Sequence, residues 1–238
     1  MVHYSDASRT RRRRHTARSP LAGPMLAFIA VTLIAAAYVA YVLWPRWPGA
    51  PVALDAPAVP IMVAGTMFNI EPAAIRVAMQ RKPGTQERVD ISYLWPSLTP
   101  PDPAIKPTVG APLDPNERLF VTISGGEATL PVTERVRTIY PRYFAPTPQA
   151  GPTGLTLRAF RDGSPYQGED LIYDPQAPDS FVARCTRRGV GNAGTCLLER
   201  RIGKADIVLR FPRDWLNDWE AVAKGVDRLI ARLHPAAG

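Results

Sequence analysis

The chain has 238 residues and a formal net charge of +8, from 29 basic and 21 acidic side chains. Much of this excess lies in the first 20 residues, where six arginines stand against one aspartate. A basic run of this kind can bind nucleic acid, but before an apolar segment it is more typical of a membrane topology signal, so we expect no nucleic-acid partner.

Residues 19–45 contain no charged side chain. As a helix, residues 21–44 are long enough to cross a bilayer core of roughly 30 Å, and we predict one transmembrane helix there. A cleaved signal peptide is one alternative, but its apolar region is usually only about 7–15 residues long. A buried core helix is another, but the apolar stripe with a period of 3.6 residues that it requires is absent.

The flanks of this segment predict its orientation. Arginine resists translocation, so residues 1–20 are expected to stay in the cytoplasm as a basic tail. The residues that carry this topology signal are Arg11, Arg12, Arg13 and Arg14. At the other end, aromatic rings suited to the membrane interface are Tyr41, Trp44 and Trp47. These features predict a single-pass protein of the cell (inner) membrane, in contact with the lipid bilayer, with its C-terminal part periplasmic or otherwise extracytoplasmic.

Residues 45–60 contain five prolines and are predicted to be a stiff, extended linker. A β-rich globular domain is expected over residues 61–234. Its first expected strand is 61–70, and residues 71–80 also alternate as a strand does, although Pro72 would suit a helix start.

Further strands are expected in the rest of this domain. Residues 88–95 alternate, with Val89, Ile91 and Tyr93 on one face, and residues 118–124 follow a proline-rich surface connection. Residues 133–140 fit either a strand or a short helix. Asp162-Gly163 is a strong turn signal between 155–160 and 166–173, and a meander is expected over 180–186, 195–201 and 205–211.

The two cysteines, Cys185 and Cys196, flank a turn-rich loop between two of these strands. In an oxidising compartment such neighbours usually pair, so we predict a disulfide across a hairpin. A two-thiolate metal site and two free buried thiols are the other possibilities.

The chain ends in a predicted amphipathic helix over 215–233, with Asp214 placed to cap it. Its commonest use is to cover a sheet, although such a helix can also bind a membrane or a partner helix. The predicted fold class is therefore α+β, mostly β: an N-terminal transmembrane helix, then an exported antiparallel-sheet domain covered by a C-terminal helix.

The available chemistry is restricted by the positions of the histidines, which are His3, His15 and His234. With no imidazole between residues 46 and 233, the usual nucleophilic triads and zinc sites are not expected in the domain. Gly189 to Gly194 spells G-x-G-x-x-G, but a strand follows it instead of a helix, so we interpret it as a hairpin loop. No cofactor or metal is predicted.

Two groups of charged residues remain as candidate sites. Glu169, Asp170 and Asp174 are spaced poorly for a glycosidase pair and are interpreted as solvated turn charges. Arginines that could grip anionic groups surround the meander, but a solvated sheet face with matching acids is the favoured reading; they are Arg184, Arg187, Arg188, Arg200, Arg201, Arg210 and Arg213.

The sequence thus predicts an envelope protein with a non-catalytic interaction or accessory role, and an envelope protein as its possible partner. The alternative is a histidine-free enzyme that acts on an envelope polymer through carboxylates.

Overall fold

A computed structural model of the chain describes residues 22–43, 52–102, 105, 117–126, 130–189 and 193–235. The chain divides into two compact units, residues 1–47 and 48–238, which are described separately. The predicted topology signal at Arg11–Arg14 and the predicted interface residues Trp44 and Trp47 lie outside the described residues.

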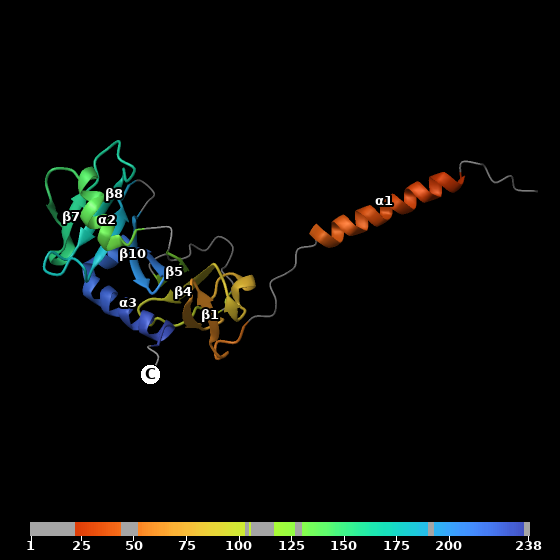
Figure 1. Cartoon of the computed structure of the whole chain (residues 1–238), viewed down its shortest axis with the longest axis horizontal. Coiled ribbons are helices and arrows are strands. Elements are labelled where there is room, and N and C mark those ends of the chain that lie inside the picture. Colours follow the sequence, from red (N-terminus) through yellow and green to blue (C-terminus); the bar gives the residue numbers. More distant parts are fainter. Residues whose placement is uncertain are drawn as a thin grey trace, which may run out of the picture. The chain divides into compact units, whose positions relative to one another are not determined.

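The first unit contains the helix α1, Ala22–Leu43 (Figure 1). Its 22 residues rise about 33 Å as an α-helix, and the side chains of residues 23–42, including Tyr41, are exposed. The hydroxyl of Thr32 donates to the Phe28 carbonyl at 2.9 Å, so this polar group is satisfied within the helix. Among the described residues α1 is the one helix long and apolar enough to span a membrane, and its exposure is contrary to that of a core helix.

The second unit begins with a hairpin. Strand β1, Val59–Val63, pairs antiparallel with β2, Thr66–Ile70, and parallel with the short β3, Gly84–Thr85. The expectation of one strand over residues 61–70 is wrong, because Ala64 and Gly65 turn the chain with φ angles of 47° and 78°. Positive φ at both central residues is the geometry that two-residue hairpin turns require.

The strand expected over residues 71–80 is also wrong. These residues form turns and the 3-10 helix η1, Ala78–Gln80, and meet the neighbouring strand through an isolated bridge between Ile75 and Ile91. The alternating apolar side chains belong to an irregular segment folded against β4, Arg88–Leu94, whose Ser92 amide donates to the Ala74 carbonyl at 2.9 Å.

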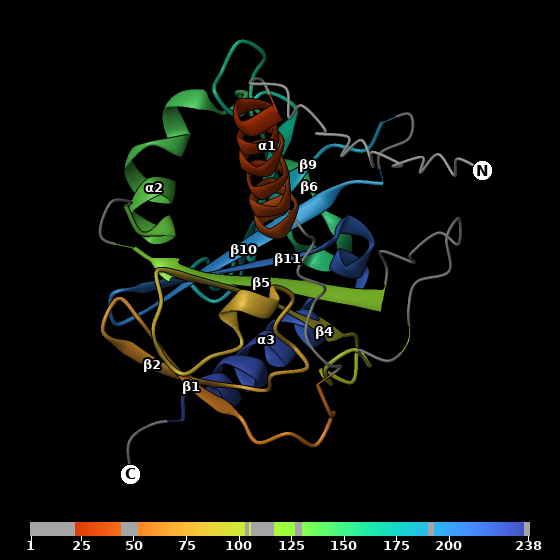
Figure 2. The ribbon, with the colours of Figure 1, turned by 90° about the vertical axis from the view of Figure 1, so that its right-hand side faces the viewer.

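The main sheet has eight antiparallel strands in the order β4-β5-β11-β10-β9-β8-β7-β6 (Figures 1 and 2). The meander β9-β10-β11 is confirmed, as are the strands predicted over 88–95 and 118–124. In chain order the strands are β4 Arg88–Leu94, β5 Arg118–Gly125, β6 Gln149–Ala150, β7 Thr156–Ala159, β8 Glu169–Tyr173, β9 Val182–Thr186, β10 Thr195–Ile202 and β11 Ala205–Pro212.

The C-terminal helix α3, Trp219–Leu233, packs on one face of this sheet together with β1 and β2 (Figure 2). Its approach is close at Gly225, where an added Cβ would lie 2.7 Å from the ring of Trp95. The 3-10 helix η5, Arg213–Asp218, precedes it, so the predicted cap at Asp214 is wrong; Asp214 instead pairs with Arg188. The predicted fold class, α+β and mostly β, is confirmed.

A second, smaller core covers the other face at the β6–β9 end of the sheet. The helix α2, Val132–Thr138, and the 3-10 helix η3, Tyr140–Tyr143, lie there (Figure 2). The ring of Tyr140 meets those of Phe160 and Tyr166 edge-on, at 5.4 and 5.0 Å between centroids. Residues 133–140 therefore contain a short helix, one of the two predicted possibilities.

The predicted disulfide is present. Cys185 of β9 lies directly opposite Cys196 of β10, and both side chains are fully buried in the larger core, with an S–S distance of 2.00 Å. The disulfide therefore joins the two strands of this hairpin on the face of the sheet that packs against the larger core.

We expect the Cys185→Ala/Cys196→Ala variant to lose about 3 kcal/mol of unfolding free energy, because the unfolded chain regains the freedom that the short closed loop removes. Urea unfolding of the full chain in detergent, followed by tryptophan emission, measures this loss. Reductant should destabilise the parent protein and leave the variant unchanged; equal stability of variant and parent contradicts the prediction.

Candidate functional site

The site is built around Asp170, the second residue of β8. Side chains alternate along a strand, so Asp170 and its neighbour Glu169 point to opposite faces of the sheet, as the sequence predicts. Asp170 faces the larger core on the side of its cross-strand partner Cys185, and only 4% of its surface is exposed. A buried carboxylate of this kind needs charged partners to replace its hydration.

Two arginines supply those partners. Arg187 Nε donates to Asp170 Oδ1 at 2.9 Å, and Arg213 Nη2 donates to Asp170 Oδ2 at 2.7 Å. We call these three residues the Asp170 clamp. Each guanidinium is fixed by a further bond, from Arg187 to the Phe160 carbonyl at 2.6 Å and from Arg213 to the Thr186 carbonyl at 2.9 Å.

The backbone around the clamp explains why the arginines reach the carboxylate. Arg187 follows β9, and its amide donates to the Gly168 carbonyl at 2.8 Å; Arg213 follows β11, and its amide donates to the Gly194 carbonyl at 3.0 Å. Gly194 has a φ of +85°, and an added Cβ would lie 3.0 Å from the Thr186 carbonyl oxygen. The last glycine of the G-x-G-x-x-G run therefore serves the hairpin, while residues 190–192 lie outside the described part of the chain.

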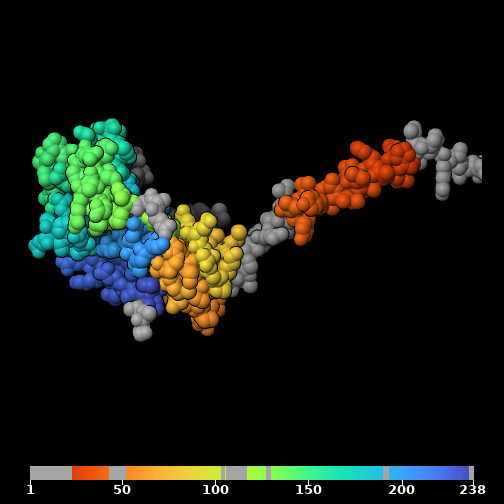
Figure 3. Space-filling view, in the orientation of Figure 1, coloured from red at the N-terminus to blue at the C-terminus, as the bar shows by residue number. Residues whose placement is uncertain are grey.

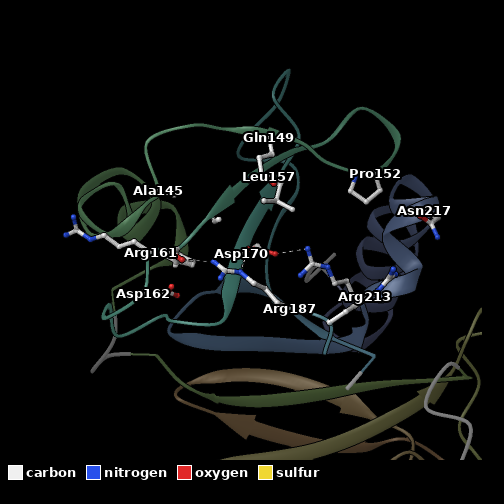
Figure 4. Close-up of a pocket in the computed structure, with 13 residues that line it drawn as sticks. Ala145, Gln149, Pro152, Leu157, Arg161, Asp162, Asp170, Arg187, Arg213 and Asn217 are labelled. Carbon is white, nitrogen blue, oxygen red and sulfur yellow. Dashed lines mark hydrogen bonds and ion pairs between the residues drawn. The ribbon is translucent and has the colours of Figure 1, made fainter. Parts of the chain in front are cut away.

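A cavity of about 790 Å³ opens above the clamp (Figure 4). It lies among β6, β7, β8 and the start of η5, and its lining includes four arginines and two aspartates. The lining residues are Ala145, Gln149, Pro152, Leu157, Ala159, Phe160, Arg161, Asp162, Asp170, Arg187, Arg188, Arg213 and Asn217.

The lining of the cavity carries a surplus of positive charge, because it includes four arginines and two aspartates, although the guanidinium of Arg161 points away from the clamp (Figure 4). Asp170 balances much of Arg187 and Arg213, and Arg188 at the rim pairs with Asp214. Arg161 is exposed and bonds to the Arg142 carbonyl at 2.7 Å, which leaves its charge uncompensated by any described carboxylate. Arg187 Nη1 likewise donates to none of the described residues. Planar, fixed guanidiniums of this kind suit carboxylate or phosphate groups.

The structure divides the acids that the sequence singled out. Asp174 accepts a bond from the Gln176 amide at 2.9 Å and is a turn residue, as interpreted. Glu169 instead pairs with Arg184 at 2.7 Å on the opposite face from the cavity, and Asp170 is the buried centre of the clamp. The interpretation as solvated charges is wrong for these two, because register brings arginines of later strands against them.

The arginines around the meander largely follow the favoured interpretation, since acids lie beside them. Arg184, Arg187, Arg188, Arg201 and Arg213 form ion pairs. Arg200 donates to the Ser180 carbonyl at 2.6 Å, and burial lowers its pKa. Arg187, Arg188 and Arg213 nonetheless come together in one cavity, which the sequence did not indicate.

The geometry gives little support to carboxylate catalysis. Both oxygens of Asp170 accept guanidinium bonds, so this carboxylate is held as a structural anion and is poorly placed to exchange a proton with a substrate. His234 lies elsewhere, with Nδ1 2.7 Å from the Met67 carbonyl. Within the described residues no group of three potential metal ligands occurs.

Sequence reasoning missed Arg161, Gln149 and Asn217 as lining residues, and it missed the clamp itself. One signal was available: Arg187 comes directly after the predicted strand 180–186, Arg213 comes two residues after the predicted strand 205–211, and Asp170 lies within the predicted strand 166–173, which begins at Glu169 in the structure. Antiparallel strands bring such ends together at one edge.

No family model matches the chain, and a search of curated proteins finds no match. Two solved structures are similar in fold. One is Smlt3025, an immunity protein of the Stenotrophomonas maltophilia type IV secretion system, with a TM-score of 0.52 and 15% identity over 78% of this chain and 98% of that chain. The other is the iron-regulated outer membrane lipoprotein FrpD of Neisseria meningitidis, with a TM-score of 0.41 and 12% identity over 75% and 98% of the two chains. The first similarity establishes a shared fold.

We expect Asp170→Asn to lower the unfolding free energy by about 3 kcal/mol, because it leaves the largely buried side chain of Arg213 and the partly exposed one of Arg187 without their anion. Urea unfolding of the full chain in detergent measures the change. Asp162→Asn is the matched control: it removes an exposed carboxylate of the same cavity and should change stability by less than about 0.5 kcal/mol. Equal effects of the two substitutions contradict a structural role for the clamp.

Proposed function

We propose that the protein is a single-pass membrane protein of a bacterial-type envelope that binds an acidic protein partner without catalysing a reaction. Its β-rich domain is held outside the cytoplasm, and the arginine-lined cavity is the binding site. The observation that carries the proposal is the Asp170 clamp, which fixes Arg187 and Arg213 beneath an open, positively charged cavity.

The anchor and its orientation are supported by four features. The helix α1 is long and apolar enough to span a bilayer, with its side chains exposed. Arg11–Arg14 precede it and favour a cytoplasmic N-terminus at the inner membrane, while Tyr41, Trp44 and Trp47 suit the opposite interface. The buried Cys185–Cys196 disulfide fits an oxidising compartment such as the periplasm.

The nature of the partner is inferred from the cavity. Rigid guanidiniums that are already oriented lose little conformational freedom when they bind a carboxylate, which favours affinity. Arg161 and Arg188 are exposed, so acidic side chains of another protein can reach them. Smlt3025, which shares the fold, is an immunity protein, and this agrees with a binding role.

The predicted orientation is tested with reporters fused after Gly238. Alkaline phosphatase folds only in an oxidising compartment, so its fusion should be active and a fusion to green fluorescent protein should be dark in the same cells. Arg11–Arg14 replaced by glutamine should shift part of the population to the reverse orientation, since the charge bias is removed. A bright fluorescent fusion with an inactive phosphatase contradicts the proposal.

The predicted binding site is tested by crosslinking in intact cells. A photo-crosslinking amino acid at Asn217, on the rim of the cavity, should yield a discrete protein adduct, whereas one at Lys224 on α3 should not. Arg161→Gln/Arg188→Gln should weaken partner binding at least about tenfold, because two charge-assisted hydrogen bonds are lost.

Arg210→Gln is the matched control, since Arg210 is an exposed arginine of β11 that does not line the cavity. An adduct at Asn217 that survives Arg161→Gln/Arg188→Gln unchanged, or that disappears equally with Arg210→Gln, counts against the cavity as the site.

A further inference from the structure

Two apolar side chains project from the folded domain at η1. Met79 is 83% exposed, more than any other large apolar side chain among the described residues of the domain, and Val77 beside it is 42% exposed. They lie in residues 76–88, which run from the hairpin region through β3 to the first residue of β4 and which we call the 76–88 loop. Two exposed apolar side chains are fewer than the contiguous patches that by themselves mark an interaction site, so the charge around them decides what this surface can bind.

The loop is held in shape by hydrogen bonds. The side-chain amide of Gln86 donates to the carbonyls of Gln80 and Lys82 at 3.0 and 2.7 Å, and Arg81 Nε donates to the Ile75 carbonyl at 3.0 Å. The Gln80 side chain in turn accepts from the Asp90 amide at 2.9 Å. Met79 is therefore presented by a preorganised loop, and little ordering remains to be done on binding.

The same loop is basic. Four of its side chains are cationic and one is anionic; they are Arg76, Arg81, Lys82, Arg88 and Glu87. Asp90 compensates Arg88 through a 2.7 Å ion pair, and the hydrogen bonds from Arg88 hold the pKa of Asp90 below its ordinary value. A positive surplus remains beside the two apolar side chains. An apolar tip flanked by cations is the combination that binds anionic bilayer surfaces.

From these features we propose that the 76–88 loop docks on the anionic lipid surface of the membrane that anchors the chain. The inference rests on the proposed anchor, because α1 keeps a lipid surface within reach. Fifteen residues separate Leu43 from Val59, and fully extended they span at most about 50 Å. Because this segment tethers the domain to the membrane, the effective concentration of the lipid surface near the domain is high. A small patch of side chains is therefore sufficient for docking. For a protein partner the two apolar side chains alone make a very small contact.

In this arrangement Met79 and Val77 enter the headgroup boundary, and Arg76 and Lys82 contact lipid phosphates. The cavity and the 76–88 loop are different parts of the domain. The cavity is built on β6 to β8, and the loop leads into β4 at the opposite edge of the same sheet. Residues 76–88 and strands β7 and β8 lie at different ends of the domain (Figures 1 and 3). Docking by the loop therefore leaves the arginines of the cavity open to a partner.

The experiment uses the full chain in nanodiscs. Met79→Cys is labelled with an environment-sensitive fluorophore; the native cysteines are joined to each other and do not react. Discs of equal parts phosphatidylcholine and phosphatidylglycerol should shift the emission to the blue, and lipid-borne nitroxides should quench it. Discs of phosphatidylcholine alone should show neither effect. Leu130→Cys, at a position 53% exposed elsewhere on the domain, is the matched control and should not respond.

Arg76→Gln/Lys82→Gln in the Met79→Cys background should abolish the quenching, and so should salt near 1 M, where screening acts within about 3 Å. Both side chains are exposed, so folding is expected to survive, as tryptophan emission would verify. Equal emission shifts and quenching for the labels at positions 79 and 130 would overturn the proposal. So would a blue shift of the label at position 79 that requires an added protein and occurs without anionic lipid. A chain that fails to enter the discs defeats the anchor itself, whereas an inserted chain with an unquenched label defeats docking alone.

Discussion

A buried carboxylate needs cationic partners to replace its lost hydration. In this protein the ion pairs of one such carboxylate join several strands at one end of the sheet. Asp170 of β8 draws in Arg187, which follows β9, and Arg213, which follows β11. The three strand ends are fixed relative to one another by charge as well as by backbone pairing. The same guanidiniums are held against the sheet by these bonds and line the cavity above it. The stability of this end of the sheet and the proposed recognition of a partner thus both depend on one buried anion.

Much of the fold could be predicted because its strands are half buried. Over residues 88–95 and 205–211 each strand has one core face, so apolar and polar side chains alternate and the pattern identifies the strand. The pattern failed where local geometry overrode it. Ala64 and Gly65 make a tight turn without the usual Asn-Gly pair, and residues 71–80 alternate while lying against β4 as irregular backbone. In neither case does the alternation of apolar and polar side chains reveal the conformation of the backbone.

The site was harder to predict from the sequence because its residues lie far apart along the chain. The disulfide could be foreseen because Cys185 and Cys196 are 11 residues apart across one turn. The partners of Asp170 lie 17 and 43 residues away, and their approach depends on the register of three strands at once. Each arginine alone was equally compatible with a solvated sheet face. Only the three-dimensional pairing separates the charges that neutralise one another from those that remain available to a ligand.

The contact between α3 and the sheet has a different kind of consequence. Gly225 leaves no room for a methyl group beside the ring of Trp95, the residue that follows β4, so α3 approaches this indole more closely than a residue with a Cβ atom would allow. A substitution at either of these two positions is therefore tolerated only when the residue at the other position leaves space for it. Related chains that place alanine or serine in the helix here are expected to carry a smaller ring or an aliphatic side chain opposite, and the two positions should vary together through evolution.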